Sequence, residues 1–236
     1  MSERGLTLTR LTSLSARLAP HDWLWAAENA DAIDRTWQRS ISETPGMFDG
    51  PVLLSQGCSV RGDACEAEFF EARFSRFLAC REAGWPDGSV SNAFSAIVPH
   101  TADGAILLGE MGRHTANAGQ IYFPCGTPDR DDIRDGGIVD LAGSAGRELL
   151  EETGLTLPHG AKAAPWVLVG GEGRLAFLQP VFFAARAEDL LAQVAAHMAR
   201  ETEPELARII VARDRSDIDS ASMPGFVRAY LEDAFG

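Results

Sequence analysis

The amino-acid sequence predicts a mixed α/β (α+β) fold, in which helices pack on a mixed sheet. Three observations favour this class. Short apolar runs bounded by turn residues recur along the chain and are typical of strands. Stretches with apolar residues at three- and four-residue steps lie between them and are typical of helices. The composition, 45% hydrophobic and 23% charged over 236 residues, is that of an ordinary globular chain.

The N-terminal region, residues 1–88, is predicted to be an extension made of a helix followed by strands. Residues 1–20 are polar and show no strong pattern, so we expect partial disorder there. Residues 22–42 carry apolar side chains, three tryptophans among them, at helical spacing. Residues 52–59 are typical of a strand, whereas 64–80 fit either a strand or a helix.

The main domain is expected over residues 89–236, because the turn signal Trp85-Pro86-Asp87-Gly88 marks a boundary. Its strands should be short and joined by turns such as Asp103-Gly104. The expected strands are 92–99, 105–111, 120–123, 166–170, 175–184 and 209–212, and the expected helices are 140–153, 187–200 and 224–235.

The central helix, 140–153, carries three carboxylates on one face. Projected at 100° per residue, Glu148, Glu151 and Glu152 cluster away from the apolar arc that contains Leu149. Like charges at these spacings destabilise a helix by roughly a few tenths of a kcal/mol per pair. A hard divalent cation such as Mg²⁺, which prefers oxygen ligands, would offset that repulsion.

The three glutamates belong to a longer motif. Its fixed and aliphatic positions are Arg147, Glu148, Leu149, Glu151, Glu152, Gly154 and Leu155. This stretch resembles the second half of the Nudix box, G-x5-E-x7-R-E-U-x-E-E-x-G-U, where U is aliphatic. A strand ending in Phe123-Pro124-x-Gly126 precedes it, as in the family.

The first half of the box departs from the family pattern. Val139 stands eight residues before Arg147, where the family has Glu, and Asp140 is the nearest acid. Gly126 lies fourteen residues before Asp140 instead of six. We therefore expect a loop about eight residues longer than usual, with Asp140 supporting the helix and its Arg147.

The resemblance implies an α/β/α sandwich and Mg²⁺- or Mn²⁺-dependent hydrolysis of a diphosphate. The substrate would be a nucleoside diphosphate linked to another group, such as a nucleotide sugar, ADP-ribose, a dinucleotide or coenzyme A. The implied metal ligands are Gly126, Glu148, Glu151 and Glu152. The implied catalytic residues are Glu151 and Glu152, with Arg147 orienting the glutamates.

Several residues outside the motif are candidates for the remaining roles. Glu205, in an acidic loop just before a late strand, is favoured as the base that accepts a proton from water, and Glu172 is the second choice. Arg113, His114 and Tyr122 lie before or on the strand that enters the box and are candidate substrate-binding residues.

Two other functions stay open. The irregular first half of the box would suit a non-catalytic Nudix-fold module that binds or senses a nucleotide. An isomerase of isoprenoid diphosphates shares the fold, and Cys125 is its candidate thiol. The presence of all three glutamates favours the hydrolase over the sensor. The position of Cys125, in the loop that leads to the metal site, argues against the isomerase.

Charge and cysteine usage limit the partners. The formal net charge is −13 and no run of Lys or Arg exists, so neither nucleic acid nor an anionic membrane is an expected partner. The four cysteines include no CxxC pair, and no secretory signal or long apolar span is present, which favours reduced thiols and a cytoplasmic location. The expected partner is a small diphosphate, and a homodimer through the tryptophan-rich helix stays open.

Overall fold

The computed structural model describes residues 5–115, 117–159 and 164–236. Strands and helices interleave along these residues, as the sequence predicts. The strands are β1 (Thr7–Leu11), β2 (Ser13–Leu18), β3 (Pro51–Arg61), β4 (Ala64–Arg73), β5 (Asn92–His100), β6 (Ile106–Met111), β7 (Ile121–Tyr122), β8 (Cys125–Gly126), β9 (Ile133–Arg134), β10 (Ile138–Val139), β11 (Trp166–Gly171), β12 (Arg174–Phe182) and β13 (Leu206–Ala212). The α-helices are α1 (Leu24–Glu28), α2 (Ala30–Glu43), α3 (Phe74–Glu82), α4 (Leu141–Thr153), α5 (Ala187–Met198) and α6 (Gly225–Ala234), and the 3₁₀ turns are η1 (Arg130–Asp132), η2 (Asp135–Gly137) and η3 (Arg215–Asp217).

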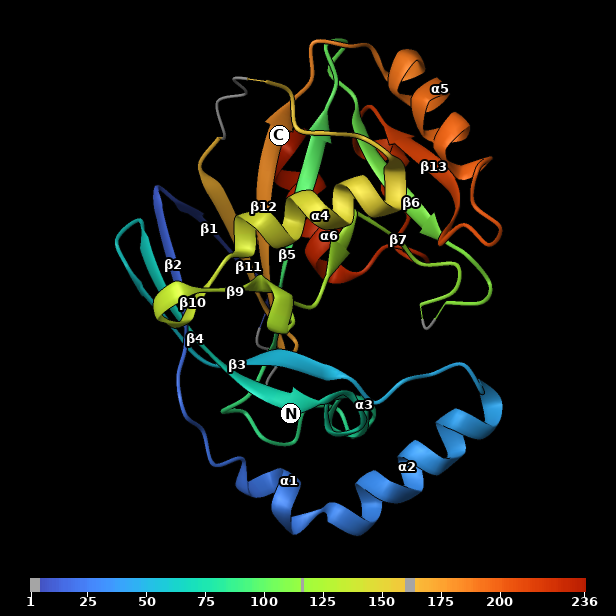
Figure 1. The fold of residues 1–236 in the computed structure, drawn as a ribbon. Helices are drawn as coiled ribbons and strands as arrows, with labels where there is room; N and C mark the ends of the chain where they lie inside the picture. The colour runs from blue at the N-terminus through green and yellow to red at the C-terminus, as the bar shows by residue number, and fades with distance from the viewer. Residues whose placement is uncertain (1–4, 116, 160–163) are drawn as a thin grey trace.

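The larger sheet has the strand order β1-β11-β12-β5-β6-β13, with β7 added to β6 and β8 added to β5. It is mixed, because β12 and β5 run parallel while the other pairs are antiparallel. Helices cover both faces of this sheet (Figure 1). One face packs on α4 and α5 through residues such as Ile97, Leu149 and Leu190, and the other packs on α6 through Phe94 and Phe226. The predicted mixed α/β class, with helices on both sides of a mixed sheet, is confirmed.

The smaller sheet has the order β3-β4-β2-β10-β9. The helices α1 to α3 lie beside it, at the opposite end of the molecule from α5 (Figure 1). A buried cluster that includes Trp23, Ile33, Leu54 and Phe70 joins these helices to the sheet. The predicted helix over 22–42 is divided into α1 and α2 at Asn29, and the ambiguous stretch 64–80 holds both a strand and a helix.

The N-terminal residues are ordered, contrary to the expectation of partial disorder in residues 1–20. From Thr7 to Leu18 the chain forms β1 and β2, while residues 1–4 lie outside the described part. The sequence of this segment shows no clear strand pattern, and its strands pair with strands far along the chain. The strand β1 pairs with β11, and β2 pairs with β4. Long-range pairing, rather than local propensity, therefore orders this segment.

Two pairings connect the sheets across residue 88. The N-terminal β1 belongs to the larger sheet, and β10 joins the smaller sheet through β2. The division into residues 1–88 and 89–236 stays a prediction. No helix in the described residues is long and apolar enough to cross a membrane.

Candidate metal centre and adjoining pocket

The helix α4 places the glutamates. Asp140 caps its N-terminus by accepting a hydrogen bond from the Gly143 backbone N–H at 2.8 Å. Gly154 ends it in the left-handed region at φ 69°. A side chain at Gly154 would also collide with His197, since a Cβ there would lie 2.6 Å from the ring carbon Cγ. The buried Leu149 fixes the rotation of the helix on the sheet.

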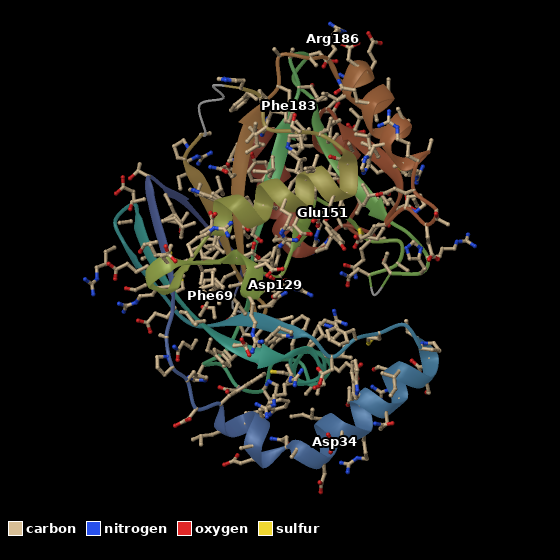
Figure 2. The ribbon with its side chains drawn as sticks, viewed as in Figure 1. Asp34, Phe69, Asp129, Glu151, Phe183 and Arg186 are labelled. Carbon is tan, nitrogen blue, oxygen red and sulfur yellow. The ribbon has the colours of Figure 1, made fainter. Side chains whose placement is uncertain are left out.

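The three glutamates of α4 differ in burial. The side chain of Glu151 is 58% exposed, whereas that of Glu148 is 15% exposed, and Glu152 as a residue is 5% exposed. The Glu152 carboxylate accepts a hydrogen bond from the Cys125 backbone N–H at 3.0 Å. Figure 2 shows Glu151 on α4 near the middle of the molecule. The helix therefore presents one exposed and two largely buried carboxylates.

Burial and like charges disfavour ionisation of the two inner glutamates. Burial, opposed by Arg147 and helped by the charges of Glu151 and Glu205, raises the pKa of the Glu148 carboxyl to about 7. Burial also raises the pKa of Glu152 well above its usual range, with Glu205 and Glu148 adding to the effect. Ionisation of all these carboxylates at once would therefore require an added positive charge beside them.

Arg147 supplies part of that charge. Its Nη1 lies 2.7 Å from Glu148 Oε1 and 3.2 Å from Glu151 Oε2. Its Nη2 lies 3.1 Å from Oδ2 of Asp132, a residue only 2% exposed. The guanidinium is therefore held by a buried acid on one side and orients two glutamates on the other.

The support for Arg147 is Asp132, so the expectation that Asp140 fills this role is wrong. Asp140 instead accepts from Gly143 and pairs with Arg134, whose Nε lies 3.1 Å from its Oδ2. Asp140 is held there by its capping geometry, since it begins the helix that carries Arg147. Asp132 was missed because it lies fifteen residues before Arg147, whereas the family pattern has eight.

The position of Asp132 also relocates the insertion. Asp132 stands six residues after Gly126, which is the spacing of the family pattern. The extra residues therefore follow the acid instead of preceding it, and there are seven of them, because fifteen replaces eight. They form β9, η2 and β10, which extend the smaller sheet beside β2. The insertion is thus a structured hairpin that joins the site to the other sheet.

Gly126 lies against the Glu148 carboxylate. It belongs to β8, and its partner in β5 is Ser95. A Cβ at Gly126 would lie 2.5 Å from Glu148 Cδ, so no larger residue fits while the carboxylate keeps its place. This close approach brings a backbone segment of the box beside a glutamate, as a shared oxygen-ligand site requires.

The residues present suit a hard cation. Carboxylate and carbonyl oxygens are the ligands that Mg²⁺ and Mn²⁺ prefer, and Glu148 and Gly126 meet without intervening atoms. Among the described residues, no three His, Cys, Asp or Glu side chains converge closely enough to hold one ion. The physical reason is visible at Arg147, which draws the carboxylates of Glu148 and Glu151 toward itself.

Glu205 lies with the glutamates of α4, although it comes from the segment before β13. Its charge raises the pKa of both Glu148 and Glu152. The pKa of Glu205 is itself raised, mainly by desolvation of its carboxylate, with His114 opposing and Glu151 adding to the rise. The Glu205 carbonyl accepts from the Gly112 N–H at 2.8 Å, which fixes this segment beside β6.

The other candidates lie at different distances from this centre. The His114 Nδ1 is 3.9 Å from Glu203 Oε1, and Arg113 is exposed in the same loop. Glu172 lies in the β11–β12 hairpin, where its Oε2 is 3.8 Å from Arg174 Nη1. Tyr122 is buried, and its hydroxyl accepts from the Asn117 side-chain amide at 3.1 Å.

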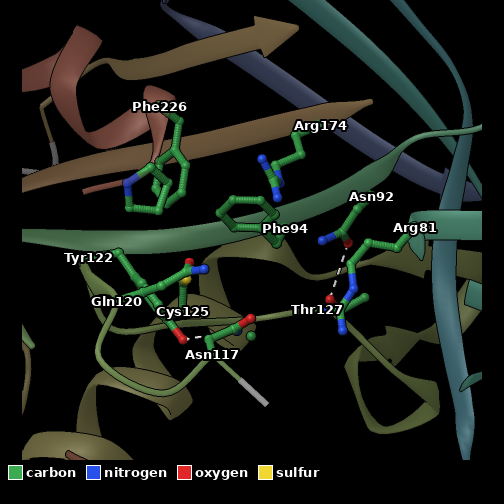
Figure 3. Close-up of a pocket in the computed structure, with 12 residues that line it drawn as sticks. Arg81, Asn92, Phe94, Asn117, Gln120, Tyr122, Cys125, Thr127, Arg174 and Phe226 are labelled. Carbon is green, nitrogen blue, oxygen red and sulfur yellow. Dashed lines mark hydrogen bonds between the residues drawn. The ribbon is translucent and has the colours of Figure 1, made fainter. Parts of the chain in front are cut away.

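A pocket of about 110 Å³ opens beside Gly126, and Tyr122 lines it. Figure 3 shows its other walls, which include Phe94 and Phe226 from the α6 side of the sheet and two arginines, Arg81 and Arg174. No pattern in the sequence predicted a role for these arginines. Arg81 belongs to α3, in the region outside the Nudix resemblance, and Arg174 is one of many isolated cations.

The environment of Cys125 disfavours its thiolate, the form that would act as a nucleophile or a base. Burial raises the pKa of its thiol well above the usual range, and the charges of Glu152 and Glu148 raise it further. Its backbone N–H, rather than its sulfur, contacts a glutamate. This environment disfavours the isomerase alternative.

No protein-family model matches the sequence, and no curated protein matches it. Solved structures do. The MutT protein from Methanosarcina mazei Go1 is 14% identical, with 61% of this chain and 92% of that chain covered and a TM-score of 0.39. A mutant of the Bacillus subtilis pyrophosphohydrolase BsRppH is 12% identical, with 63% and 81% covered and a TM-score of 0.34.

RenU, a Nudix hydrolase from M. smegmatis, is 16% identical, with 62% of this chain and 88% of that chain covered and a TM-score of 0.37. The structure is thus similar to those of Nudix hydrolases.

Proposed function

We propose that the chain is a divalent-cation-dependent pyrophosphohydrolase that cleaves a diphosphate linkage between a nucleoside and another group. One observation carries the proposal: burial, together with the charge of Glu205, raises the pKa of both Glu148 and Glu152 at a place where Gly126 touches the Glu148 carboxylate. Crowded carboxylates repel one another, which costs free energy. Such a cluster is therefore expected to bind a cation or to move protons. An anionic diphosphate would meet such an acidic site only through metal ions.

Each residue of the centre has a separate task. Glu148, Glu151 and Glu152, with the carbonyl of Gly126, would hold Mg²⁺ or Mn²⁺. A cation bound there supplies Lewis acidity and lowers the pKa of a bound water. Asp132 fixes the Arg147 guanidinium, Arg147 orients Glu148 and Glu151, and the Cys125 N–H orients Glu152.

Glu205 is the favoured proton acceptor. Its carboxylate lies near the α4 glutamates but on a different segment, so it is free of the Arg147 ion pairs. A raised pKa makes a carboxylate a better base toward water. In the proposed reaction a Glu205 oxygen takes a proton from the attacking water, whose oxygen bonds to one phosphorus of the diphosphate. The bond from that phosphorus to the bridging oxygen breaks, and both halves leave as phosphate products. Glu172, which lies against Arg174 in another hairpin, is the weaker choice.

The test is a substrate screen with product identification. Purified protein with Mg²⁺ would be incubated with nucleotide sugars, ADP-ribose, dinucleotides and coenzyme A, and products would be identified by mass spectrometry. We expect a nucleoside monophosphate or another phosphomonoester, and loss of turnover in Glu151→Gln and Glu205→Gln. The matched control is Glu203→Gln, which removes an exposed acid from the loop of Glu205.

Two outcomes would contradict the proposal. Turnover that survives Glu151→Gln would place the chemistry elsewhere. Tight, metal-independent nucleotide binding without any turnover would favour the non-catalytic sensor. A cytoplasmic location and a homodimer stay predictions, to be checked by fractionation and by light scattering.

A further inference from the structure

The pocket beside Gly126 carries an unusual concentration of positive charge for so acidic a chain. Arg81 enters it from the last turn of α3, and Arg174 enters it from the first residue of β12 (Figure 3). Asn92, the residue paired with Arg174 across the parallel strands, lines the same pocket as a further polar group. These three side chains line one cavity: Arg174 and Asn92 come from the larger sheet, and Arg81 comes from a helix beside the smaller sheet.

Arg81 is partly buried and, in the described part of the chain, has no paired acid. Among the described residues, its guanidinium forms no ion pair and no hydrogen bond, and it lies 5.5 Å from the centre of the Phe77 ring. By contrast, Arg10, Arg130 and Arg208 each pair with a carboxylate. Arg174 has only a distant partner, at 3.8 Å in Glu172. A partly buried cation without a counter-ion is costly, so the pocket is complete only with an anion inside it.

The arginines and the glutamate centre occupy different levels of the sheet. Arg174 pairs with Asn92, whereas Gly126 pairs with Ser95, three residues further along the same strand β5. At about 3.3 Å per residue, the two levels are about 10 Å apart. If the diphosphate that is cleaved lies at Gly126, the two arginines would therefore contact a different part of the same substrate.

We propose that this pocket is a subsite for a second anionic group, a phosphate monoester carried on the substrate apart from the diphosphate that is cleaved. Two guanidinium groups suit a dianionic phosphate, because each presents a fork of donors to its oxygens. The aromatic walls, Phe94 and Phe226, suit the apolar body that joins the two groups. The position of the cleaved diphosphate rests on the proposed function, whereas the anion site itself does not.

The first experiment locates the anion with inorganic phosphate as the probe. With EDTA present to remove cations, phosphate is titrated into the full chain while the arginine Nε–H signals are followed by NMR. We expect Arg81 and Arg174 to shift, and at least fivefold weaker binding in Arg81→Gln and in Arg174→Gln. Arg76→Gln, an exposed arginine on the same α3 helix, should bind as wild type. Arg81→Lys keeps a charge and should fall between them.

The second experiment compares matched pairs in EDTA by calorimetry: NADP⁺ with NAD⁺, and coenzyme A with dephospho-coenzyme A. We expect the member with the extra phosphomonoester to bind about tenfold more tightly in at least one pair. Arg81→Gln and Arg174→Gln should reduce that advantage to about twofold, while Arg76→Gln should keep it.

Three results would overturn the inference: no phosphate-induced shift at either arginine, no advantage in either pair, or equal weakening of both members of a pair. The last would mean that the arginines hold the cleaved diphosphate itself. Failure of the proposed function would give a different result: no turnover of any substrate, while the member of each pair with the extra phosphate still binds more tightly.

Discussion

The two halves of the glutamate centre are built in different ways. The helix α4 supplies Arg147 and three glutamates at fixed helical spacings, so their relative positions follow from the sequence alone. The segment from Gly126 to Asp140 supplies a supporting acid whose partner is fifteen residues away. The comparison teaches that a regular element can be extrapolated from its period, whereas a loop with an insertion can be placed only by its contacts.

The largest effect is expected in the helix half. Glu152→Gln should lower turnover on the order of 10³-fold, because a metal-ligating charge is lost. Thermal stability should stay equal or rise, since the Gln carbonyl can still accept from Cys125 and a buried carboxyl that is costly to ionise is replaced by a neutral amide. Turnover assays and thermal unfolding of the same sample would show both effects. Glu203→Gln is the control, and wild-type turnover in Glu152→Gln would contradict the assignment.

A smaller effect is expected in the loop half. Asp132→Asn should lower turnover about 10- to 100-fold, as for other residues that orient metal ligands. Arg147 would lose its buried counter-charge and hold Glu148 and Glu151 less firmly. Steady-state kinetics at several Mg²⁺ concentrations would measure this loss. Asp131→Asn, at the exposed neighbouring position, should change little, and an equal loss there would remove Asp132 from its supporting role.

The substitution Asp140→Ala distinguishes the role of Asp140 from that of Asp132. It should lower the free energy of unfolding by about 1 kcal/mol, the typical cost of a lost N-cap. Turnover should stay within about twofold of wild type, because Arg147 keeps Asp132. Urea unfolding and a turnover assay would test this together. A loss of turnover as large as that of Asp132→Asn would restore Asp140 as the support for Arg147.

An effect of similar size on stability is expected outside both halves, at His100, where it depends on pH. Burial lowers the pKa of His100 from 6.5 to about 4 in the folded state, where its Nε2 lies 2.8 Å from the Tyr230 hydroxyl. Between these values the unfolded chain holds more protons, so stability falls as the pH is lowered from 6.5 toward 4.

The contribution of His100 is on the order of 1 kcal/mol after allowance for its partial exposure. Urea unfolding at several pH values would measure it. His100→Phe should flatten the dependence in this window, and the exposed His159→Gln should not. An unchanged slope in His100→Phe would assign the acid sensitivity to other groups.

The fold class and α4 were predictable because each rests on a local period. The strand periods and the turn residues predicted most of the larger sheet, and the glutamate spacing predicted one face of α4. The strands β1 and β2 were not predictable, since their order comes from partners far along the chain. Asp132 had a signal, its six-residue distance from Gly126, but counting back from Arg147 led to Asp140. The convergence of Arg81 and Arg174 depends on how two sheets meet, which no local pattern encodes.

The pairing of β1 with β11 has a consequence for how the chain is made. Thr7 and Gly170, which face each other across these strands, are 163 residues apart. During synthesis from the N-terminus, β1 emerges first and must remain unpaired until β11 has left the ribosome. Its open backbone groups can meanwhile pair with other chains. Closure of the larger sheet is therefore expected to be a late and slow event in folding, governed by chain length rather than by local stability.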